Sequence, residues 1–158
     1  MEKCHIILAV ITGIYLVLCS WWDIKERMIY TFPCTMLTGL WIGYSIMKGE
    51  VEPRILMAYI VLFTVLYTTF VLTKAWGGGD SDLLLLYGAV HIAQMRGGFS
   101  LYDISSQCIG LAIVLVIAAL VGFIEARVQG EKLECDSSIA IAPGYAVVIS
   151  YFMIGGFL

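Results

Sequence analysis

Two aspartates, Asp23 and Asp80, carry the chemistry that this sequence offers. Asp80 follows three consecutive glycines and precedes a run of leucines, and Asp23 follows an apolar run that ends in two tryptophans. A carboxylate at the edge of a membrane-embedded segment is costly, so each is a candidate functional group. Two neighbouring carboxylates share a proton, and such a pair can activate water while protonating a carbonyl oxygen. The pair indicates hydrolysis of the aspartic-peptidase type, which needs no metal, cysteine or serine.

The residues around Asp80 suggest how such a site would be shaped. Gly77, Gly78 and Gly79 allow positive φ and close approach of another chain, so they are expected to form a turn at the site. The plainer alternative is a helix capped by Asp80 after an ordinary loop. Asp82 is a candidate substrate contact, or else it interacts with the dipole of the first helical turn.

The composition is typical of a polytopic membrane protein. Of 158 residues, 61% are hydrophobic and 13% are charged, and the mean hydropathy is +0.94. A net charge of −3 without a basic block argues against nucleic-acid binding. The five cysteines form no C-x-x-C pair, which argues against a disulfide framework or a zinc site. We predict no metal and no cofactor.

Apolar periodicity and length predict an all-α fold with six transmembrane helices in one domain, residues 1–158. The predicted spans cover residues 4–22, 32–47, 55–73, a segment from about 83, 102–124 and 139–158. The fourth segment meets Arg96 after about 13 residues, which is short for a full crossing. The last span contains Pro143 near its start, where an interruption is expected.

The order of the spans predicts that the aspartates meet. Two crossings separate Asp23 from Asp80, so the chain returns to the same membrane face. Five Lys and Arg residues on that face against four on the other favour a cytoplasmic orientation. Asp80 would lie at a helix N-terminus and Asp23 near a helix C-terminus. The helix dipoles therefore predict that Asp80 is the more readily ionised member and Asp23 the more often protonated one.

Three segments resemble motifs of one peptidase family. Residues 23–29 (DIKERMI) resemble the first-aspartate motif of type IV prepilin peptidases and archaeal preflagellin peptidases. Residues 77–80 (GGGD) resemble the family's second motif, the G-x-G-D signature. Residues 139–144 (IAIAPG) are similar to the proline-containing segment that opens the family's last helix, so Pro143 is expected to shape the site.

The resemblance implies a membrane aspartic endopeptidase with Asp23 and Asp80 as its catalytic pair. Such an enzyme removes the short basic leader from type IV prepilin or pseudopilin precursors at the cytoplasmic face of the inner, cytoplasmic membrane. It implies membrane lipid and the pilus assembly machinery as further partners, and no cofactor. Larger family members carry a cysteine-rich domain and N-methylate their products, so this chain is expected to be of the short, peptidase-only type.

The sequence departs from the family pattern near the pair. Tyr30-Thr31 stand where the family usually has Pro-Asn, and Asp82 stands where it usually has Lys, so local substrate contacts are open. Lys25 and Arg27 are candidate substrate contacts, with simple anchoring at the membrane interface as the alternative. His91 is expected to be a hydrogen-bonded intramembrane histidine rather than a catalytic one.

Two other classes of function fit the same residues. One is a small proton- or cation-coupled transporter with the acidic pair as its ion site. The other is a non-catalytic membrane scaffold in which both aspartates are merely interfacial. The presenilin-like intramembrane proteases share G-x-G-D, but no Tyr-Asp pair, which is their first motif, precedes residues 77–80 in this sequence.

Overall fold

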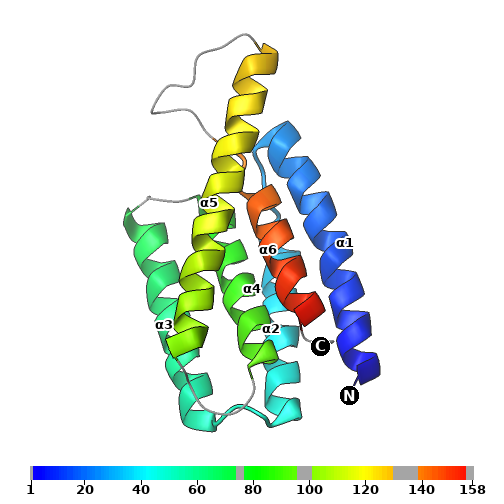
Figure 1. Ribbon diagram of the computed structural model, residues 1–158, viewed down its shortest axis with the longest axis vertical. Coiled ribbons are helices and arrows are strands. Elements are labelled where there is room, and N and C mark those ends of the chain that lie inside the picture. Colours follow the sequence, from blue (N-terminus) through cyan, green and yellow to red (C-terminus); the bar gives the residue numbers. More distant parts are fainter. Residues whose placement is uncertain (1, 74–76, 96–100, 130–138, 156–158) are drawn as a thin grey trace.

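The described part of the chain is a bundle of six helices. The computed structural model describes residues 2–73, 77–95, 101–129 and 139–155, and successive helices run in opposite directions (Figure 1). The helices are α1 (Glu2–Glu26), α2 (Thr31–Lys48), α3 (Pro53–Thr73), α4 (Gly78–Gln94), α5 (Leu101–Gln129) and α6 (Ala142–Gly155). The all-helical prediction is therefore confirmed for the described residues.

The central helix is α4, which packs against α2, α3 and α6. Twelve of its 17 residues are buried, so it is surrounded by protein on most of its circumference. Gly88 allows this packing, because a Cβ there would lie 2.7 Å from the Phe63 ring of α3. The helix that carries Asp80 in its first turn is thus held firmly inside the bundle.

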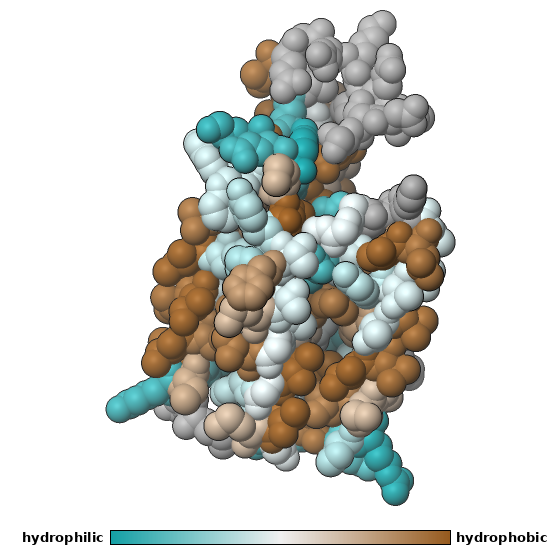
Figure 2. Space-filling model, turned by 180° about the vertical axis from the view of Figure 1, so that it is seen from behind, coloured by the Kyte–Doolittle hydropathy of each residue, from teal (hydrophilic) through white to brown (hydrophobic). Residues whose placement is uncertain are grey.

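Within the described residues, α1, α3 and α5 are long and apolar enough to span a membrane. The candidate spans are Lys3–Glu26, Pro53–Thr73 and Ser105–Glu125. Large apolar side chains cover much of the outer surface, as Figure 2 shows, and such a surface suits lipid. The helices α2, α4 and α6 fall short by length or hydropathy, since α6 has only 14 residues and α4 begins with glycines and acids.

The ends of α1 and α4 differ from the predicted ones. Helix α1 continues past Trp22 to Glu26, so Asp23 lies in its last turn rather than after it. Arg27 ends the helix with a φ of 54°, and its N–H donates to the Asp23 carbonyl oxygen at 3.1 Å. Helix α4 begins at Gly78 instead of near Leu83.

Two further predictions concern the later part of the chain. Helix α6 begins at Ala142, and Pro143 occupies its first turn, where a missing N–H costs nothing. The predicted span from residue 139 is thus helical only from Ala142, and Pro143 marks the start of the helix rather than a break within it. Arg96 and most of the predicted polar loop, residues 130–138, lie outside the described residues.

Buried polar contacts fix the helices against one another. The indole N–H of Trp41 on α2 donates to the Thr12 hydroxyl of α1 at 2.9 Å. Tyr15 of α1 donates to the Tyr30 carbonyl oxygen at 3.2 Å, just before α2. Lipid offers these polar groups no hydrogen-bond partner, so the two bonds satisfy them. The same bonds join α1 to α2.

We expect Gly144→Ala to destabilise the protein by about 1–3 kcal/mol, because overpacking would force α6 away from α5. An added Cβ would lie 2.5 Å from the Val114 carbonyl oxygen of α5. Gly43→Ala is the matched control, since nothing lies within 4 Å of that added Cβ. Thermal unfolding in detergent micelles measures both variants, and equal stability of the two would contradict the packing described.

Candidate acidic site

Asp23 lies in the last turn of α1 and is only 5% exposed. Its Oδ2 accepts a hydrogen bond of 2.9 Å from the backbone N–H of Ala142. Ala142 is the first residue of α6, so the carboxylate faces the positive end of that helix. A buried carboxylate needs such a donor, and α6 provides it.

Asp80 lies in the first turn of α4 and is half-buried. The backbone N–H of Gly77 donates to its Oδ2 at 3.3 Å, so the side chain reaches back to the residue before the helix. Asp80 therefore also stabilises the N-terminus of α4, as the plainer interpretation of the sequence predicts. In the sequence, Asp80 lies just before the apolar run that begins at Leu83.

The structure brings the two aspartates together at one end of the bundle. Burial, and after it the charge of Asp23, raises the pKa of Asp80 to about 6, while the Gly77 N–H acts in the opposite direction. Cys19 of α1 interacts electrostatically with both carboxylates. The end of α1 and the start of α4 lie at the same end in Figure 1. The predicted return of the chain to one face thus agrees with the geometry.

The geometry favours the opposite assignment of the two carboxyls to the predicted one. Asp23 was expected to be the protonated member because the C-terminus of α1 disfavours an anion. The N-terminus of α6 and the nearby Arg27 guanidinium offset this effect. Asp80 has a single long hydrogen bond and faces the charge of Asp23. The arrangement favours Asp23 as the anion and Asp80 as the proton carrier.

Asp82 does not join the pair. It is 4% exposed, and the hydroxyls of Thr31 and Tyr67 donate hydrogen bonds to its carboxylate. These partners belong to the start of α2 and to α3, so Asp82 ties α4 to both helices. Asp82 therefore has a structural contact with both helices, and its role as a substrate contact stays a prediction.

The two basic candidates lie at the edge of the site. Lys25 is exposed in the last turn of α1. Arg27 is exposed and forms an ion pair with Glu125 of α5. This pair ties the end of α1 to α5, so Arg27 has a structural contact beside any contact with a substrate.

The glycines act through close packing rather than through left-handed backbone. Gly77 has a φ of −62°, and among the described glycines only Gly49 has a positive φ. A Cβ on Gly79 would lie 2.5 Å from the Cβ of Ile29, whereas Gly78 has nothing within 4 Å. Gly79 therefore allows α4 to start directly against the segment that follows α1.

Sequence reasoning missed one feature, a cavity between α4, α5 and α6 that neither aspartate lines. It contains His91, which is hydrogen-bonded to Ser106 and Gln107 at 3.0 Å each. The prediction of a hydrogen-bonded His91 is thus confirmed. Only the spacing of polar residues in the first turns of α5 could have indicated the cavity. Among the described residues, no cluster of three or more His, Cys, Asp or Glu side chains could hold a metal ion.

The fold and site define a helical protein that contains three possible membrane spans and a buried acidic pair. Comparisons of the chain with protein-family models, with curated proteins and with solved structures found no match. The likeness to prepilin peptidases therefore depends on the motif residues alone.

We expect Asp23→Asn to lower the pKa of Asp80 below 6 while leaving it above 3.8. Removing the charge of Asp23 removes the second cause of the shift, whereas burial, the largest cause, remains. Infrared titration of the protonated carboxyl band, assigned by its loss in Asp80→Asn, measures the change. Glu26→Gln is the control, because Glu26 is not among the charges that act on Asp80. An unchanged pKa of Asp80 in Asp23→Asn would show that the two carboxyls do not interact.

A second prediction concerns the adjacent glycines. Gly79→Ala should destabilise the protein by about 1–3 kcal/mol because the backbone at Ile29 must move. Gly78→Ala should leave stability within about 1 kcal/mol, since its Cβ meets open space. Thermal unfolding compares the two neighbours directly, and a greater loss in Gly78→Ala would contradict the packing at Gly79.

Proposed function

We propose that the protein is a membrane aspartic endopeptidase that removes the short basic leader from type IV prepilin-like precursors. The observation that carries the proposal is the electrostatic contact between Asp23 and Asp80, which belong to different helices and share one end of the bundle. The motif likeness around both residues gives the substrate class.

The hydrogen bonds and charges around the pair support the protonation states that such a reaction requires. The Asp23 carboxylate accepts a proton from water, and the water oxygen attacks the carbonyl carbon of the scissile peptide bond. Asp80, which keeps its proton up to about pH 6, donates it to the carbonyl oxygen. When the tetrahedral intermediate breaks down, the C–N bond breaks and the leaving amine, the mature N-terminus, takes the proton held by Asp23. A hydroxyl of the intermediate returns its proton to Asp80, and the leader leaves as the carboxylic acid.

The membrane arrangement follows the same proposal. All six helices cross, and α1, α3 and α5 carry most of the large apolar side chains that are exposed on the surface. The aspartate end faces the cytoplasm, and the protein belongs in the cytoplasmic membrane with the pilus assembly machinery. The alternating direction of the helices supports an even number of crossings.

We expect Asp23→Asn and Asp80→Asn each to reduce precursor cleavage by about 10⁴-fold, because paired catalytic groups act as a unit. The chain is co-expressed with a candidate prepilin, and leader removal is followed by the shift in precursor size. Glu26→Gln is the matched control, since this acid is exposed on the same helical turn as Asp23. Thermal unfolding verifies that each variant folds.

Other outcomes would overturn the proposal. Cleavage that persists in either aspartate variant would exclude the pair as the catalytic machinery. Proton- or cation-dependent flux in vesicles, without precursor processing by the unmodified chain, would favour the transporter. Neither activity, with both substitutions tolerated in the cell, would favour a scaffold.

A further inference from the structure

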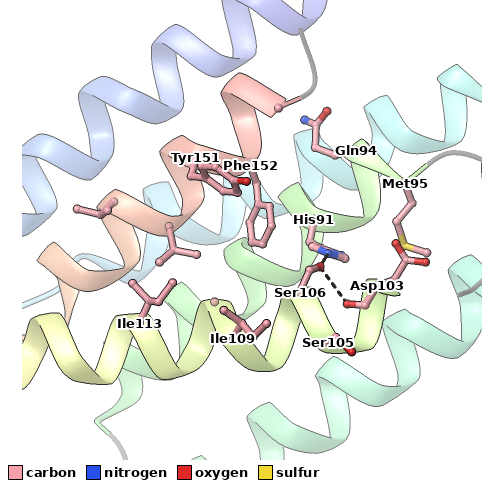
Figure 3. Close-up of a pocket in the computed structure, with 14 residues that line it drawn as sticks. His91, Gln94, Met95, Asp103, Ser105, Ser106, Ile109, Ile113, Tyr151 and Phe152 are labelled. Atoms are coloured by element: carbon pink, nitrogen blue, oxygen red, sulfur yellow. Dashed lines mark hydrogen bonds between the residues drawn. The ribbon is translucent and has the colours of Figure 1, made fainter. Parts of the chain in front are cut away.

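Asp82 is a buried acid that the proposed mechanism does not use. It is 4% exposed and lies in α4, two residues after Asp80. It does not line the cavity between α4, α5 and α6, which Figure 3 shows in close-up. A carboxylate in the interior is costly unless hydrogen bonds compensate for the water that it loses, so its place here needs a reason.

Two hydroxyl groups from two other helices meet this carboxylate. The Thr31 hydroxyl comes from the first residue of α2, and the Tyr67 hydroxyl comes from α3. Both hydroxyls donate to the Asp82 carboxylate, whose two oxygens are acceptors only and can receive both bonds. An amide in its place would accept one of them and present its own N–H groups to the other. The type of residue 82 therefore matches its two partners.

The bond from Tyr67 also bears on how α3 is attached to the bundle. The buried residues of α3 are Leu56, Tyr59 and Phe63, and Tyr67 lies about one turn beyond the last of them. Helix α3 packs mainly against α4. The bond from Tyr67 to Asp82 therefore holds the half of α3 that is nearer to the acidic pair against the start of α4.

A second contact fixes the same part of α4. A Cβ on Gly79 would lie 2.5 Å from the Cβ of Ile29, so α4 already packs closely against that residue. Residues three apart share a helix face, so Gly79 and Asp82 hold one face of α4 in place. Asp80 lies between them in the sequence, and its own hydrogen bond from the Gly77 N–H is long at 3.3 Å. The direction of the Asp80 carboxyl therefore depends on how its helix is held.

We propose that Asp82 is a positioning residue of the peptidase, which with Thr31 and Tyr67 fixes the start of α4 so that the Asp80 carboxyl stays beside Asp23. The inference rests on the proposed function, and Asp82 acts through Asp80 without touching the substrate. Catalysis depends on such geometry, since a misplacement of about 1 Å can cost about 100-fold in rate.

Cleavage kinetics of the detergent-purified full chain with a purified candidate prepilin test the proposal. We expect Asp82→Asn to lower kcat by about 100-fold and to leave KM within about twofold, because the precursor still binds. Rates are expressed per folded molecule, with the folded fraction taken from near-ultraviolet circular dichroism, so a loss of stability alone does not lower them. Glu26→Gln is the control, because it neutralises an exposed acid outside this contact.

Two milder variants test the contact itself. Tyr67→Phe and Thr31→Val each remove one hydroxyl and should each lower kcat by about tenfold. Thr68→Val and Thr35→Val are the matched controls, because these exposed hydroxyls donate to carbonyl oxygens of their own helices. Adding Tyr67→Phe to Asp82→Asn should lower kcat by less than about twofold further, since both changes break one contact.

Other results would overturn the proposal. An unchanged kcat in Asp82→Asn would show that Asp80 keeps its place without the contact. A rise in KM alone would make Asp82 a substrate contact instead. Equal effects of Tyr67→Phe and Thr68→Val would exclude the bond to α3 as a positioning contact. Each of these results leaves cleavage by the unmodified chain, and with it the peptidase proposal, intact, whereas no cleavage by the unmodified chain would remove both proposals.

Discussion

The hydrogen bond from the Ala142 N–H to the Asp23 carboxylate is the contact on which the acidic site depends. It joins residues 119 apart in sequence and lies in the interior. A buried carboxylate without a donor would be costly, so the first residue of α6 must remain against the last turn of α1. Pro143 lies in the first turn of α6, where its missing N–H removes no helical hydrogen bond. Gly144 lets α6 approach α5. The C-terminal helix thereby determines the electrostatics of a residue near the N-terminus.

Much of the fold could be predicted from the sequence, because apolar length and periodicity mark the helices directly. Counting the apolar segments was enough to predict the order of the six helices. It also predicted that Asp80 returns to the end of the bundle that carries Asp23. The boundaries near the site could not be predicted. Polarity suggested that α1 ends at Trp22, yet the helix continues to Glu26 and ends where Arg27 adopts a left-handed conformation that few non-glycine residues take. The three glycines suggested a turn, but the packing of Gly79 against Ile29 depends on a tertiary contact.

The reversed assignment of the carboxyls has the same origin. A dipole argument made along the sequence includes only the helix that carries each residue, and for Asp23 that helix ends in a disfavouring C-terminus. The donor that offsets it comes from α6, which no local pattern connects to residue 23. Asp82 illustrates the reverse case. Its charge stood out in the sequence near the site, but its partners Thr31 and Tyr67 hold it in the packing between helices.

Helices α4 and α6 each contribute to both ends of the bundle. Their first turns contact the acidic pair, and their later turns line the cavity. Tyr87 joins the two regions, because its hydroxyl donates to the Gln107 carbonyl oxygen at 2.8 Å and its ring contacts that of Tyr145. Since α4 is buried and α6 is in backbone contact range of α5, neither helix can shift at one end alone. The close packing that holds Asp23 and Asp80 in place therefore also fixes the walls of the cavity.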